Sequence, residues 1–193
     1  MNRIDTKGLL LRIFIPTIVL SMSYLILGHF CNIPYILLFC ILGTVILLPM
    51  ELGMIISASK KEYGTYSLKS ALEGQEQLAL WKIVLIAFVF FGIAGLLSAF
   101  VAPIENHIFS VARSNLLSNL PIGFDWTDYE YLKIFSKPII IFTCVYYGIF
   151  NALIAPITEE LFFRGYLISH YKKQSSFTPI LIAVLFSLYH FWL

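Results

Sequence analysis

Two adjacent glutamates and an arginine interrupt an apolar part of the sequence, within residues 156–165. Acidic residues inside apolar membrane segments are rare, and each is a functional candidate by default. If the segment is helical, Glu160 and Arg164 lie four residues apart on one face, where the arginine can hold the carboxylate with two parallel hydrogen bonds. Glu159 lies about 100° round the helix from Glu160 and has no such counter-ion. The two glutamates are therefore not equivalent, and Glu159 is the candidate general base.

His190, at the end of the run FSLYH, is the second candidate. The stretch 172–176 is a good turn and lies midway between Glu159 and His190. An antiparallel helical hairpin would therefore place both residues about 18 Å from that turn, at one depth in the membrane. A carboxylate and an imidazole at one depth can form an acid–base pair or half of a metal site. Two other interpretations stay open: the charged run marks the end of a span, and His190 is a packing residue.

Both runs together carry a resemblance. EELFFR at 159–164 matches the pattern EExxxR, and FSLYH at 186–190 matches FxxxH. This ordered pair, on successive membrane helices, resembles the CPBP family of CAAX prenyl endopeptidases and bacteriocin-processing (Abi) proteins. The resemblance covers about residues 138–193. It implies an intramembrane endopeptidase that opens toward the cytoplasm.

The resemblance also implies roles for the four residues. Glu159 and His190 would activate the attacking water, with Glu160 and Arg164 supporting the site. Two mechanisms stay open: a metalloendopeptidase, in which Glu159 and His190 hold a divalent metal such as zinc, or a metal-free enzyme with Glu159 alone as base.

The end of the sequence differs from the family pattern. The family has a later helix with HxxxN or HxxxD, which no residue after His190 can supply. Residues 177–193 would form about 25 Å of helix, less than the membrane core of about 30 Å. We therefore expect the chain to be truncated after its second motif.

The composition requires a membrane around these residues. Hydrophobic residues make up 59% of the 193-residue chain and charged residues 12%, whereas soluble chains carry about 25% charged residues. This excludes a water-soluble globular protein, a disordered chain and a nucleic-acid-binding protein. The apolar runs do not alternate in polarity as barrel strands do. We therefore expect one all-α domain, a multi-pass transmembrane helical bundle within the lipid bilayer.

The bundle should have four full spans and an incomplete fifth, because a helix needs roughly 20 apolar residues to cross the bilayer. The third should end at Pro103. The fourth is longer than the membrane core, so it must tilt, protrude or break, with Gly148 and Pro156 as plausible break points. The expected spans are residues 8–28, 33–57, 83–102, 138–171 and 178–193.

Lysine and arginine residues orient the bundle, because cytoplasmic segments carry an excess of them. With a cytoplasmic N-terminus, ten lie on the inner side and three on the outer side. This predicts a multi-pass plasma-membrane protein whose first span is not cleaved and whose active site faces the cytoplasm. The long external connection holds Asp125, Asp128 and Glu130 next to Trp126 and Tyr129, a mixture that suits an interfacial loop or a short amphipathic helix. Glu51 is predicted to be an interfacial carboxylate.

The first functional hypothesis is a membrane peptidase acting on a peptide or a prenylated protein. The alternative is a non-catalytic membrane protein, such as a bacteriocin self-immunity factor, and a third idea is a small proton-coupled transporter. The sequence leaves the substrate open among a prenylated CAAX protein, a bacteriocin leader and another short peptide.

Overall fold

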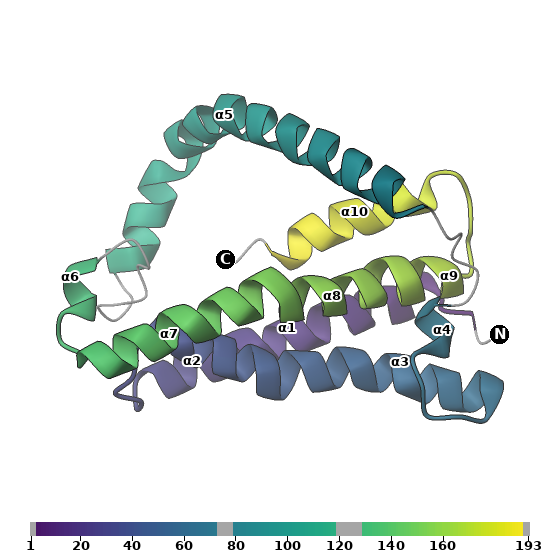
Figure 1. Ribbon diagram of the computed structural model, residues 1–193, viewed down its shortest axis with the longest axis horizontal. Helices are drawn as coiled ribbons and strands as arrows, with labels where there is room; N and C mark the ends of the chain where they lie inside the picture. Colours follow the sequence, from purple (N-terminus) through teal and green to yellow (C-terminus); the bar gives the residue numbers. More distant parts are fainter. Residues whose placement is uncertain (1–2, 73–78, 119–128, 191–193) are drawn as a thin grey trace. The chain divides into compact units, whose positions relative to one another are not determined.

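The computed structural model describes residues 3–72, 79–118 and 129–190 (Figure 1). These ranges are helical, apart from turns and one isolated backbone bridge between Ile4 and Tyr171. The α-helices are α1 (Thr6–Gly28), α2 (Tyr35–Leu42), α3 (Leu48–Tyr63), α4 (Lys69–Leu72), α5 (Leu80–Ser118), α6 (Tyr129–Leu132), α7 (Lys137–Ile149), α8 (Ala155–Glu159), α9 (Ile168–His170) and α10 (Thr178–Tyr189). The π-helical stretches are η1 (Gly43–Leu47), η2 (Phe150–Ile154) and η3 (Glu160–Leu167).

Within the described residues, four continuous helices are long and apolar enough to cross a membrane, namely Thr6–Gly28, Tyr35–Tyr63, Val84–Val111 and Lys137–His170. The expected all-α, multi-pass class is therefore confirmed. The chain divides into two compact units, residues 1–74 with 126–193, and residues 75–125. The first unit contains both sequence motifs, EELFFR and FSLYH, and α5 lies in the second unit.

The prediction that a helix ends at Pro103 is wrong, because α5 continues through this proline to Ser118. A proline inside a helix removes one backbone hydrogen bond and bends the helix without necessarily ending it. The ribbon of α5 is accordingly bent (Figure 1). Of the predicted interfacial residues, Asp125, Trp126 and Asp128 lie outside the described residues, whereas Tyr129 and Glu130 begin the short helix α6.

Two prolines in the long helices of the first unit each follow a stretch of wide π-helical turns. The Leu48 N–H bonds to the Gly43 carbonyl just before Pro49, and the Ala155 N–H bonds to the Phe150 carbonyl just before Pro156. Proline lacks a backbone N–H, and its ring clashes with the carbonyl of the preceding turn. A wider π-helical turn makes room for the ring while the neighbouring N–H groups stay hydrogen-bonded. Of the three outcomes expected for the overlong fourth span, the structure therefore excludes the break: Lys137–His170 is one helix.

The π-helical stretches η1 and η2 pack directly against each other. A Cβ atom at Gly43 would lie only 2.5 Å from Cζ of Phe150, so the absence of a side chain at Gly43 makes room for this ring. Around the crossing lies a buried cluster whose members are Cys40, Leu48, Phe150 and Ala155. This close crossing brings the helix that carries Glu51 against the helix that carries Glu159.

The chain start is joined to the end of the long helix. The Ile4 N–H donates to the His170 carbonyl at 2.7 Å, and the Lys172 N–H donates to the Ile4 carbonyl at 2.8 Å. The Thr6 and Tyr171 hydroxyls bond to each other at 3.1 Å. These bonds fix the chain start against the residues that directly follow the long helix.

A second close approach occurs just after Arg164. The short helix α4 packs on η3, and a Cβ atom at Gly165 would lie 2.5 Å from the backbone carbonyl oxygen of Ala71. Ser70 beside it is buried and donates to the Ile55 carbonyl at 2.9 Å. The glycine that follows the charged motif therefore has a packing reason.

Replacing Gly165 by alanine should lower the melting temperature in detergent, because overpacking against a backbone atom costs about 1–3 kcal/mol. Gly148→Ala is the matched control: it lies in the same long helix, and its new Cβ would meet nothing within 4 Å. Alanine is the better helix former, so this control should be neutral or stabilising. Thermal unfolding followed by circular dichroism measures both variants, and equal melting temperatures would contradict the close approach.

Candidate active site

Glu159 and His190 meet across the hairpin formed by the long helix and α10. Glu159 is the last residue of α8, and His190 directly follows α10. Oε1 of Glu159 lies 3.4 Å from Nε2 of His190. The two side chains are 19% and 31% exposed, so the pair is half-buried but still open on one side. The hairpin geometry expected from their equal distances to the turn therefore brings the two groups together.

The ring of His190 is held in one orientation. Its Nδ1 lies 3.0 Å from the Phe186 carbonyl, which can only accept, so Nδ1 carries the proton of this bond. This leaves Nε2 toward Glu159. Phe186 and Tyr189 pack against the imidazole with ring centroids 4.5 and 4.8 Å away. The aromatic run before the histidine thus orients its ring.

Glu160 and Arg164 form the ion pair that their four-residue spacing predicts. Nη1 of Arg164 lies 2.9 Å from Oε2 of Glu160, and both side chains are exposed. An exposed pair contributes at most about 1 kcal/mol to stability. Its effect is to bind Glu160 away from the Glu159–His190 pair, so the two glutamates have different partners.

A groove of about 340 Å³ runs beside the pair, between the long helix and α10. Its floor and walls are mostly apolar, and its polar groups are those of the charged motif. The groove is lined by Pro156, Glu159, Glu160, Phe163, Arg164, Ile168, Pro179, Ile182, Ala183 and Phe186. An apolar groove with a few convergent polar groups is the usual form of a site for a small or extended ligand.

The structure corrects the position predicted for Glu51. Its side chain is 0% exposed, and its Oε1 accepts a 2.9 Å hydrogen bond from the Tyr189 hydroxyl. Glu51 is close enough to Glu159 and His190 to interact with both electrostatically. The helical spacing that it shares with the buried residues Leu48 and Ile55 is the sequence signal that could have revealed this.

His170, the last residue of the long helix, is also buried. Its Nε2 lies 3.0 Å from Oε2 of Glu62, and the two side chains are 2% and 7% exposed. Its Nδ1 donates to the Tyr166 carbonyl at 2.9 Å. Sequence reasoning missed Glu62, because its partner is 108 residues away in the chain. This buried pair joins α3 to α9 and lies on a different turn from the Glu159–His190 pair.

The described residues do not by themselves fit a catalytic zinc ion. Such sites use three protein ligands and one open position. Glu159 and His190 supply two donors, and no group of three or more histidine, cysteine, aspartate or glutamate side chains that could hold a metal occurs in the described ranges. We therefore derive no step of the reaction through a metal.

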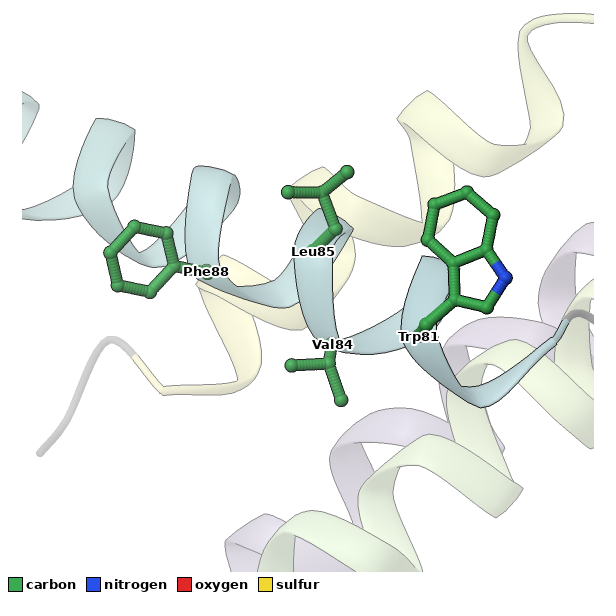
Figure 2. Close-up of a pocket in the computed structure, with 4 residues that line it drawn as sticks. All are labelled: Trp81, Val84, Leu85 and Phe88. Carbon is green, nitrogen blue, oxygen red and sulfur yellow. The ribbon is translucent and has the colours of Figure 1, made fainter.

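A second hollow lies on α5 of the other unit (Figure 2). It is lined by Trp81, Val84, Leu85 and Phe88, all from one helix. The indole nitrogen of Trp81 is the only polar side-chain atom among them, so the hollow has no acid, base or nucleophile and offers no catalytic chemistry.

Residues 141–193 match the protein family described as Rce1-like, type II CAAX prenyl endopeptidase. The matched range begins inside α7 and includes both sequence motifs, EELFFR and FSLYH, together with the groove and the Glu159–His190 pair. No curated protein and no solved structure matches the chain.

The Glu62–His170 and Glu160–Arg164 pairs have similar lengths but should differ in their contribution to stability. His170→Ala leaves a buried carboxylate without one of its partners, which costs about 1–3 kcal/mol. Arg164→Ala removes an exposed pair and should cost less than about 1 kcal/mol. Thermal unfolding of the purified protein in detergent compares the two variants. A larger loss for Arg164→Ala would mean that the burial of the His170–Glu62 pair has been misjudged.

Proposed function

We propose that the protein is an intramembrane protease of the CPBP type and that it hydrolyses a peptide bond with water activated by Glu159 and His190. The match of residues 141–193 to the Rce1-like family supports the first part of this proposal. The single observation that carries the proposal is the 3.4 Å approach of Oε1 of Glu159 to Nε2 of His190 beside a groove. The family match independently supports a protease of the CAAX type.

The chemistry follows from the two groups. A water molecule bound to the Glu159 carboxylate loses its proton to that carboxylate as its oxygen attacks the substrate carbonyl carbon. The leaving amine must then gain a proton before the carbon–nitrogen bond breaks. The Glu159 carboxyl group can return the proton to it, and His190, whose Nε2 faces that carboxyl group, can hold the water in place. The half-buried position of the pair leaves one side open for the substrate and the attacking water.

Glu160 and Arg164 have a supporting role in this proposal. Because Arg164 binds the Glu160 carboxylate at 2.9 Å, Glu159 is left as the carboxylate that faces the histidine. Both members of the ion pair line the groove. They therefore offer polar contacts to the backbone of an extended peptide, whereas the apolar lining accepts its side chains or an attached lipid.

Glu159 and His190 supply two of the three protein ligands that a catalytic zinc site uses. The proposal therefore includes both a metal-free form with Glu159 as base and a form in which the two residues hold a divalent metal. In the proposed orientation the N-terminus and the α9–α10 connection lie on the cytoplasmic side of the plasma membrane. The substrate class is a peptide bond close to the membrane surface, as in a prenylated CAAX protein.

The full-length protein in proteoliposomes should cleave a fluorogenic farnesylated CAAX peptide. Glu159→Gln and His190→Ala should each lower kcat by about 10²–10⁴-fold, the usual contribution of a general base or its partner. His29→Ala is the matched control: this histidine is exposed at the end of α1 and bonds only to its own helix at Leu25 in the described contacts. It should leave kcat unchanged.

Different outcomes separate the alternatives. Cleavage that survives both site variants would overturn the peptidase proposal. Loss of activity on chelation, with recovery on adding zinc, would assign the metal-dependent form, and activity unchanged by chelation would assign the metal-free form. Absence of cleavage together with bacteriocin protection that survives Glu159→Gln would favour the non-catalytic immunity protein.

A further inference from the structure

Burial of the Glu51 carboxyl group costs free energy, which packing contacts alone do not offset. Its side chain is 0% exposed. Oε1 binds the Tyr189 hydroxyl, while Oε2 has no hydrogen-bond partner within the part of the chain that the structure describes. A buried carboxyl group with one unsatisfied oxygen is less favourable than an apolar side chain of similar volume. The bond to Tyr189 is therefore the interaction that a glutamate provides here and a leucine does not.

Tyr189 connects this bond to the candidate catalytic histidine. It is the last residue of α10, and His190 directly follows it. The His190 N–H bonds to the Ser187 carbonyl at 3.2 Å, so the backbone has left the regular α-helical pattern at this point. A residue at a helix end is held less firmly than one inside the helix. The position of His190 thus depends on what fixes Tyr189.

Side chains from three segments hold Tyr189. Its ring lies 5.1 Å from the ring of Phe163 in η3, at an angle of 72°, and 4.8 Å from the imidazole of His190. Its hydroxyl reaches across to Glu51 in α3. The bond therefore joins the end of α10 to a helix that carries neither of the two sequence motifs.

We propose that Glu51 is a positioning residue: by holding the Tyr189 hydroxyl, it fixes the end of α10 so that His190 stays beside Glu159. This inference rests on the proposed function for its kinetic consequences. Glu51 acts through Tyr189 and need not touch the substrate.

The test separates positioning from a merely structural role. In the double variant Glu51→Leu/Tyr189→Phe, apolar groups of similar shape replace both partners, which is neutral or stabilising when the pair serves stability alone. We expect the melting temperature to be equal to or above that of the wild type. We also expect kcat for the farnesylated peptide to fall about 10–100-fold with an unchanged KM, because a small displacement of a catalytic group has effects of this size.

Two further variants complete the comparison. Glu51→Gln keeps a carbonyl oxygen that can accept from Tyr189, so it should restore most of the kcat lost with Glu51→Leu. Tyr171→Phe is the matched control: its hydroxyl is also in a buried residue and bonds to Thr6, away from the site. It should not change kcat. A double variant with wild-type kcat, or a Glu51→Gln variant as inactive as Glu51→Leu, would overturn the positioning role.

A second measurement does not depend on turnover. Glu159→Cys and His190→Cys are combined after Cys31, Cys40 and Cys144 are replaced by alanine, and a short bifunctional maleimide joins the new thiols. Introducing Glu51→Leu/Tyr189→Phe into this double-cysteine protein should slow the cross-linking at least several-fold, whereas introducing Tyr171→Phe should not. An unchanged rate would overturn the positioning role even if the enzyme is active. Full activity of Glu159→Gln and His190→Ala would instead remove the proposed function, and cross-linking would then decide the role of Glu51 alone.

Discussion

The hydrocarbon core of a membrane has no water to bind a free carbonyl, carboxylate or hydroxyl group, and the rest of this structure depends on that constraint. Each proline that follows a π-helical stretch shows it. The helices that contain Pro49 and Pro156 continue through wide turns in which N–H groups bond five residues back. Because the helices do not break, the long helix can carry Glu159 far from its turn, to the level of His190.

The same constraint explains the close helix crossings. Without a hydrophobic driving force between helices in lipid, packing and interhelical hydrogen bonds hold them together. Gly43 makes room for the Phe150 ring, and Gly165 makes room for the Ala71 carbonyl. Ser59 and Ser70 bond to each other at 2.9 Å in the same region, so α4 is joined to α3 by polar contacts as well as by close packing.

Several pairs of polar groups in the first unit join separate helices. Glu62 meets His170, Glu51 meets Tyr189, and Glu159 meets His190. The first pair is deeply buried, and the last is half-buried beside a groove. This difference in exposure separates a contact that serves stability from one that a substrate and a water molecule can reach.

The sequence by itself determined the membrane class, the helical fold, the two motifs and the helical hairpin that brings Glu159 beside His190. These follow from local information: composition, the lengths of apolar runs, and distances counted along helices from one turn. The four-residue spacing of Glu160 and Arg164 likewise predicted their ion pair. By contrast, Glu51 was taken for an interfacial residue and Pro103 for the end of a helix, and both predictions were wrong. Only the tertiary structure decided that Glu51 lies under Tyr189 and Glu62 beside His170, because those contacts join residues more than 100 positions apart. Their geometry depends on how closely the helices cross, which no local pattern contains.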